Sequence, residues 1–180
     1  MLDRGETMPS PKAVAVTVSV VAAAVLSPGT ALAASSPSPQ DITWMKTSAA
    51  GDLFEIQGGR MAQTHAHSAA VKQFGARLVA DHTKSLGSMK KLAAQMKVTL
   101  PTAPDSKERA ELARLSSLHG AAFDKQYVKT EISDHKMDIS DAKKQISTGS
   151  NRQVINEARK DLPVLQAHLK LAEQTQSKVG

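Results

Sequence analysis

Apolar residues recur at intervals of three and four along four long segments of the chain. This spacing places them on one face of an α-helix, whereas a strand would need strict alternation. Clusters of Gly, Pro, Ser and Asn separate the segments and bound the predicted helices, which cover residues 41–65, 68–97, 121–147 and about 151–176. A shorter helix is predicted over about 105–119, because Asp105 and Glu108 have the spacing of a capping box.

Smaller signals refine these helices. Ser38 is expected to cap the first one, and Ser150 with Gln153 resembles a capping box for the last. The adjacent Gly58 and Gly59 are expected to let a neighbouring helix approach closely. Pro163 predicts a kink or a restart in the last helix. Aromatic residues make up only 3% of the chain, which also favours helix over strand. The sequence therefore predicts an all-α antiparallel four-helix bundle with a short extra helix between the second and third long helices.

The N-terminal part has the pattern of an export signal. Residues 13–26 form an apolar run that follows Lys12 and is too short to cross a bilayer core of about 30 Å. Ala31 and Ala33 supply the small residues that signal peptidase accepts. The alternative is a membrane anchor that is never cleaved, and Met8 is an alternative start to Met1.

These features predict three parts. They are a signal peptide over 1–33, a Pro/Ser linker over 34–40 and one helical domain over 41–180. We expect the domain to be exported to the periplasm or the cell exterior, with no integral membrane segment after cleavage.

Composition narrows the function. The absence of cysteine excludes disulfides, thiolate catalysis and a lipidated cysteine. The chain carries a formal charge of +6, but its Lys and Arg are spread among Asp and Glu, which predicts solvated helix faces and no nucleic-acid partner. It contains neither a Gly-x-Ser-x-Gly nucleophile elbow nor a Gly-rich phosphate loop, so a conventional enzyme is not predicted.

Histidines interrupt the apolar faces of the predicted helices. His82 and His135 lie within apolar stripes, and His168 lies beside one. With a rise of about 1.5 Å per residue, they fall within about two turns of one level in the middle of the bundle, together with Glu55. Buried imidazole and carboxylate groups need partners, which predicts a site for one transition-metal ion, Zn, Cu or Fe. The candidate ligands are Glu55, His82, Glu131, His135 and His168.

Two alternatives remain open from the residues alone. The polar layer could be a hydrogen-bonded spacer that fixes helix register in a metal-free interaction module, whose basic faces would meet an acidic partner in the cell envelope. A weaker candidate is a copper site at Met61, His65 and His67, which offer soft ligands near the end of the first helix. The oligomeric state cannot be predicted.

Three segments also resemble a known family: 74–100, 120–135 and 162–172. They contain Asp-His, Phe-Asp-x-x-Tyr, a second Asp-His and Leu-Pro-x-Leu-x-x-His-Leu, in that order, as in domain-of-unknown-function family 4142. The resemblance implies an exported protein, often labelled an outer-membrane protein, with a ferritin-like four-helix bundle and no established activity. The positions that match the family pattern are Glu55, Asp81, His82, Phe123, Asp124, Tyr127, His135, Pro163 and His168.

One departure from ferritins limits this implication. Di-iron bundles use Glu-x-x-His on two helices, and this motif occurs nowhere in the chain. A di-iron oxidase or an iron store is therefore not expected, whereas a mononuclear histidine-rich site is.

Overall fold

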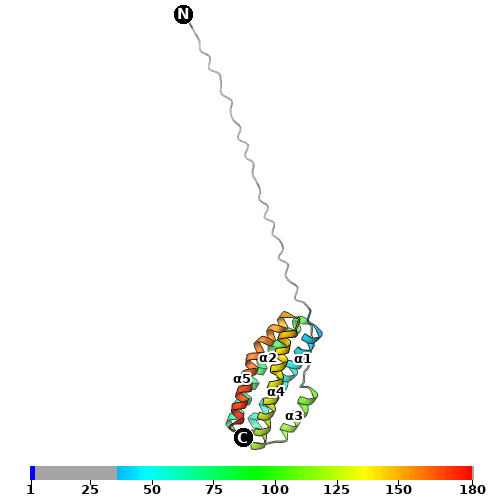
Figure 1. The fold of residues 1–180 in the computed structure, drawn as a ribbon, viewed down its shortest axis with the longest axis vertical. Helices are drawn as coiled ribbons and strands as arrows, with labels where there is room; N and C mark the ends of the chain where they lie inside the picture. Colours follow the sequence, from blue (N-terminus) through cyan, green and yellow to red (C-terminus); the bar gives the residue numbers. More distant parts are fainter. Residues whose placement is uncertain (3–35, 180) are drawn as a thin grey trace. The chain divides into compact units, whose positions relative to one another are not determined.

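The computed structural model describes residues 1–2 and 36–179 of the chain, and the described domain is all-helical (Figure 1). Its five helices are α1 (Pro39–His65), α2 (Ala69–Met96), α3 (Ser106–Ser116), α4 (Gly120–Thr148) and α5 (Arg152–Gln176). No strand occurs within residues 36–179. The predicted signal peptide, apart from Met1 and Leu2, lies outside the described residues. Within them, no helix has the length and apolar character needed to cross a membrane.

The four long helices pack side by side as a bundle. The most extensive contacts join α1 to α2 and α4 to α5, and α1 also packs on α4 and α2 on α5. His65 at the end of α1 stacks on His119 at the start of α4, with ring centroids 4.3 Å apart. At the other end, Gln145 near the end of α4 donates to Asp41 in the first turn of α1. α1 and α4 are therefore antiparallel, and the short connections make α1–α2 and α4–α5 antiparallel hairpins.

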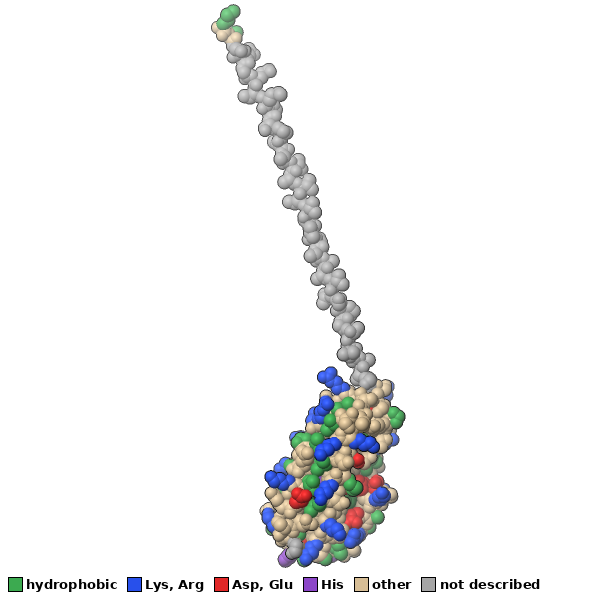
Figure 2. All heavy atoms as spheres, viewed as in Figure 1, with side chains coloured by type: hydrophobic (Ala, Val, Ile, Leu, Met, Phe, Trp, Pro, Cys, Tyr) green, Lys and Arg blue, Asp and Glu red, His purple; other side chains and the backbone are tan. Residues whose placement is uncertain are grey.

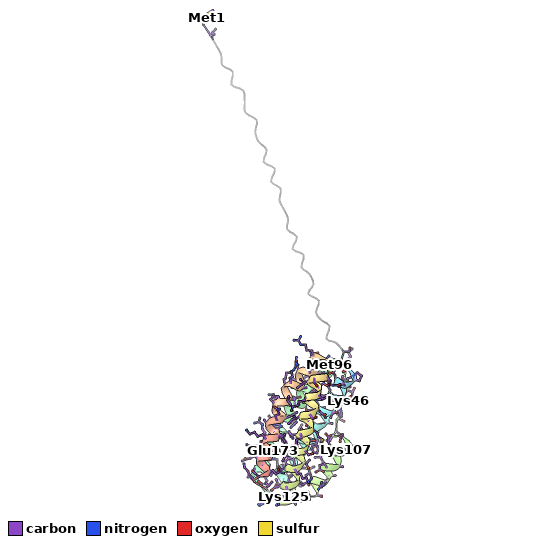
Figure 3. All side chains as sticks on the ribbon, in the orientation of Figure 1. Met1, Lys46, Met96, Lys107, Lys125 and Glu173 are labelled. Carbon is purple, nitrogen blue, oxygen red and sulfur yellow. The ribbon has the colours of Figure 1, made fainter. Side chains whose placement is uncertain are left out.

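The connection between α2 and α4 runs the length of the bundle. Both helices are antiparallel to α1, so they point the same way, and the chain must return between them. Met96 and Lys125 accordingly lie at opposite ends of the molecule (Figure 3). The return contains α3, which packs mainly against α1. The predicted short helix is thus part of a long crossover.

Side-chain caps set several helix ends. Ser38 and Asp41 form a capping box at α1, and Asp105 and Glu108 form one at α3, both as predicted. The cap of α5 differs from the prediction: Asn151 accepts from the amides of Gln153 and Val154. Ser150 does not cap because its hydroxyl donates to Asp41.

One proline and two glycines test the remaining local predictions. α5 runs unbroken through Pro163, so the predicted restart is wrong; this residue is exposed, and the carbonyl that loses its partner can bond to water. Gly59 does allow a close approach. A Cβ built there would lie 2.6 Å from the carbonyl oxygen of Gly75 on α2, and one on Gly75 would lie 2.6 Å from the Cβ of Ala62.

The apolar core is divided into layers. Along α2, residues 71–78 contribute to one apolar cluster and residues 86–93 to another, with His82 between them. Within the first cluster, Phe123 stacks on Tyr127, and the ring of Phe74 is tilted against Tyr127. Lys and Arg are scattered over the visible surface and form no continuous patch (Figure 2). The chemistry of interest therefore lies in the buried polar layer between the two clusters.

Candidate metal centre

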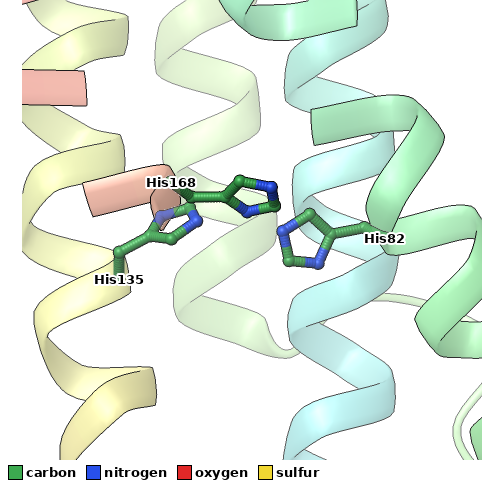
Figure 4. A group of neighbouring side chains, drawn as sticks. All are labelled: His82, His135 and His168. Carbon is green, nitrogen blue, oxygen red and sulfur yellow. The ribbon is translucent and has the colours of Figure 1, made fainter. Parts of the chain in front are cut away.

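Three histidines from three helices face one another in this layer (Figure 4). His82 lies on α2, His135 on α4 and His168 on α5, and none is more than 4% exposed. Their ring centroids are 5.2–5.8 Å apart. The histidines occupy the apolar stripes of their helices, so helix packing alone brings the rings together. We call this set the three-histidine layer.

One nitrogen of each ring is held by an oxygen atom. These contacts are His82 Nδ1 to Asp52 Oδ1 at 2.8 Å, His135 Nδ1 to the Glu131 carbonyl oxygen at 2.9 Å, and His168 Nε2 to Asp81 Oδ2 at 2.9 Å. Carbonyl and carboxylate oxygens accept hydrogen bonds, so the proton of each neutral ring belongs on the nitrogen that faces them. The lone pair is left on the other nitrogen.

The other nitrogens have no hydrogen-bond partner among the described residues. They are His82 Nε2, His135 Nε2 and His168 Nδ1, all buried. Each histidine can place one ring nitrogen within 4.8 Å of the others. Buried polar atoms without a partner are uncommon in folded proteins, and a set that converges in this way can hold a metal ion.

Glu55 on α1 completes the layer. Its Oε1 lies 3.3 Å from His135 Nε2 and its Oε2 lies 2.6 Å from His82 Nδ1, but neither oxygen has hydrogen-bond geometry. Glu55 also belongs to two further close groups, one with Asp52 and His82 and one with Asp134 and His135. A ring nitrogen can bond only one metal ion at a time. These overlapping groups are therefore alternative ligand sets for one ion at the three-histidine layer, not separate sites.

The four groups of the layer differ in charge. Burial opposes ionisation, but the charge of Glu55 and the hydrogen bond that His82 donates to Asp52 raise the pKa of His82 well above its usual value. The charge on His82 outweighs burial and lowers the pKa of Glu55. Burial lowers the pKa of His135 and brings that of His168 to about 4. At neutral pH the layer therefore contains a charged pair of His82 with Glu55 and two neutral imidazoles, so a metal that bonds to His82 must displace a proton.

Of the predicted ligands, Glu131 has a different position. Its carboxylate Oε2 lies 3.6 Å from His135 Nδ1, the nitrogen already held by the Glu131 carbonyl. Burial, with the charge of Glu55, raises the pKa of Glu131 well above its usual value. The structure thus brings Glu55, His82, His135 and His168 together and places the Glu131 carboxylate behind His135.

Sequence reasoning missed Asp52 and the role of Asp81 as partners of the histidines. Asp81 adjoins His82 in the chain but bonds to His168 on α5. Asp52 lies one turn before Glu55, and this spacing was the signal that could have identified it. The two histidines of the weaker copper candidate have different surroundings. His65 stacks on His119, whereas His67 is exposed and its backbone amide donates a hydrogen bond to Asp124.

Comparisons with known proteins show the family from the sequence and the fold from the structure. The family model "Domain of unknown function (DUF4142)" matches residues 26–175. The structure is similar to a DUF305 fragment from Deinococcus radiodurans, with a TM-score of 0.71 and 14% identity, over 80% of this chain and 99% of that one. It is also similar to a "putative secreted protein DUF305" from Streptomyces coelicolor, with a TM-score of 0.68 and 12% identity, over 78% and 92% of the chains. At such identities the likeness shows the fold alone. No curated protein matches the chain.

Proposed function

We propose that this chain, which belongs to the DUF4142 family, binds one transition-metal ion in its three-histidine layer. One observation carries the proposal: three buried histidines from different helices lie together, and each has one ring nitrogen without a hydrogen-bond partner among the described residues. Their opposite nitrogens are fixed by oxygen acceptors, which is the usual arrangement around metal-bound histidine. Glu55 is the candidate fourth ligand.

The donor set favours a particular class of metal. Imidazole suits Zn²⁺, Cu²⁺ and Fe²⁺, whereas Mg²⁺ and Ca²⁺ prefer all-oxygen sites. Three neutral nitrogens and one carboxylate leave a net charge of +1 on a bound divalent ion, which is small enough for a buried layer. The layer therefore suits a divalent transition metal better than Mg²⁺ or Ca²⁺.

The proposal includes an exported, ferritin-like protein. The long crossover between α2 and α4 supports the ferritin-like arrangement, because bundles of that class contain one long connection. The N-terminal apolar run supports export, as does the description of one structural neighbour as secreted.

Cobalt titration tests the metal site directly. We expect purified chain without an affinity tag to bind one Co²⁺, giving visible absorption bands of a low-coordinate nitrogen-rich site, and Zn²⁺ to displace it. Zn²⁺ should also raise the melting temperature, because a ligand selective for the folded state stabilises it. Both effects should weaken as the pH falls, because protons compete with the metal for His82, whose pKa is raised well above its usual value.

Matched variants locate the site. His135→Gln and His168→Gln should each remove the bands and the thermal shift, whereas His119→Gln, on the exposed stacked pair, should keep both. A melt that no transition metal shifts at pH 7.5, together with the absence of cobalt bands, would show that the layer is a hydrogen-bonded spacer in an interaction module.

A further inference from the structure

A pocket of about 330 Å³ borders the three-histidine layer. Its wall includes Asp52, Glu55 and His82, whereas His135 and His168 do not line it. The layer and the pocket therefore share one wall, and a cation in the pocket would be next to His82.

The pocket is acidic although the chain as a whole is basic. Two of its cationic side chains already form ion pairs: Arg77 pairs with Asp81, and Lys160 pairs with Glu157. Asp138 on α4 and Asp161 on α5 also line the pocket, and neither forms an ion pair with any residue of the described domain. Negative charge thus exceeds positive charge at this point.

A second observation indicates a ligand. Asp52 is only 4% exposed and lines the pocket, yet its Oδ2 has no hydrogen-bond partner among the described residues. Asp161 Oδ2 is likewise buried and unpartnered. Burial, with the charges of Glu157 and Asp52, raises the pKa of Asp161 to about 7. These carboxyl groups repel one another, and a cation between them would relieve the repulsion.

The spacing of the carboxylates defines the kind of cation. Among the described residues, no group of three that includes Asp138 or Asp161 brings its ligand atoms within 4.8 Å of one another. The walls therefore provide no complete inner coordination sphere. A divalent ion that keeps several waters, as Mg²⁺ and Mn²⁺ do, fits a roomy ring of carboxylates better than a bare ion.

We propose that this acidic pocket is a second cation site, which holds a hydrated divalent ion and delivers metal to the three-histidine layer. The oxygen atoms come from Asp52, Asp138 and Asp161, on three helices. Cation binding in the pocket does not depend on the proposed function, whereas delivery of metal to the three-histidine layer rests on it. An acidic cleft raises the local concentration of cations and can increase association rates by about 10–1000-fold.

The test uses one probe for each site. Mn²⁺ binding, measured by electron paramagnetic resonance, reports the pocket, and the rate at which cobalt bands appear after rapid mixing reports delivery. We expect the double variant Asp138→Asn with Asp161→Asn to lose Mn²⁺ binding and to load Co²⁺ at least about tenfold more slowly, with unchanged final absorbance. His135→Gln should show the opposite pattern, with Mn²⁺ retained and cobalt bands lost. Glu173→Gln, an exposed carboxylate outside the pocket, is the control for lost charge.

The outcomes separate the two proposals. Equal Mn²⁺ binding in the double variant and the wild type would overturn the pocket site. Lost Mn²⁺ binding with an unchanged cobalt rate would overturn delivery alone. If wild type shows no cobalt bands, the proposed function and delivery both fail, and Mn²⁺ binding still decides the pocket. Circular dichroism melts of each variant verify that it is folded.

Discussion

At the scale of single residues, the orientation of each histidine depends on one acceptor. His168 is the clearest case, because its Nε2 reaches the carboxylate of Asp81 from a neighbouring helix. That bond fixes which nitrogen carries the proton and directs the other one inward. Asp81 is partly exposed and also pairs with Arg77, so it can be changed without opening a cavity in the core.

Asp81→Asn should therefore weaken metal binding and leave the fold intact. Loss of a carboxylate partner behind a ligating histidine typically lowers metal affinity about 10–100-fold. Competition with a chromogenic zinc chelator measures the change. Arg77→Ala removes the neighbouring ion pair but keeps the Asp81–His168 bond, and we expect an affinity close to that of the wild type. Equal weakening in both variants would mean that surface charge, and not the orientation of His168, controls binding.

Residue-scale prediction from sequence succeeded where a helical stripe decides the position. His82 and His135 interrupt stripes of apolar residues, so their burial follows from periodicity. Partners such as Asp52 and Asp81 depend on the rotation of one helix against another, which sequence spacing does not determine. His82 and His135 lie near the middle of α2 and α4, so their common level does not depend on the direction of either helix.

At the scale of helices, Asp41 joins three chain segments at one end of the bundle. This fully buried carboxylate accepts hydrogen bonds from Ser38, Gln145, Ser150 and the amide of Asn151. Burial raises its pKa, but these hydrogen bonds outweigh burial and lower the pKa well below 3.8. The ends of α1, α4 and α5 are thus fixed by one ionised group.

Asp41→Asn should lower the free energy of unfolding by about 2–4 kcal/mol at pH 7, because hydrogen bonds to a charged group contribute about 1.5–3 kcal/mol each. The lowered pKa sets the sign with pH: the stabilisation is complete above the unfolded value of 3.8 and is lost as the pH falls toward the folded value. The gap between the variant and the wild type should accordingly narrow below about pH 4 in urea titrations. A gap that is constant from pH 7 to pH 3 would contradict this account.

Two glycines of α2 provide a matched pair. Gly75→Ala should destabilise the domain by about 1–3 kcal/mol, because the new Cβ would lie 2.6 Å from Ala62 and push α1 away. A Cβ added at Gly87 would meet no atom of the described domain within 4 Å, so Gly87→Ala should stabilise the domain by about 0.5–1 kcal/mol through helix propensity. Thermal and urea unfolding of both variants measure the difference. If both variants changed the free energy of unfolding in the same direction, the close contact with α1 would not be the reason for glycine at position 75.

The boundaries of the four long helices were predicted to within two residues, because Gly, Pro and capping residues act locally, whereas α3 ends three residues before its predicted end. Ser38 and Asp105 behave as their spacing predicts. Ser150 does not, because a distant carboxylate takes its hydroxyl and leaves the cap to Asn151. Pro163 breaks no helix because it faces away from the core. In both cases the tertiary environment of the residue overrides the local signal.

At the scale of the whole molecule, the order of helices could not be derived from periodicity. Stripes show which faces are buried but not which helices are neighbours. The direction of α4 follows from contacts at the ends, the stack of His65 on His119 and the bond of Gln145 to Asp41. The predicted export signal belongs to this scale too, since it concerns where the domain works.

N-terminal sequencing of protein secreted by its native host should give Ala34 as the first residue, because Ala31 and Ala33 fill the small-residue positions of the cleavage site. Ala33→Asp should block this cleavage and leave a longer product. Intact protein in the cytosolic fraction of the native host would contradict export.

The division of the ligands between the two helical hairpins has a consequence of its own. The α1–α2 hairpin carries Glu55 and His82, and the α4–α5 hairpin carries His135 and His168. Binding to all three histidines therefore needs both halves of the domain. A metal in the layer would join the two hairpins, and its binding would signal that they have packed against each other.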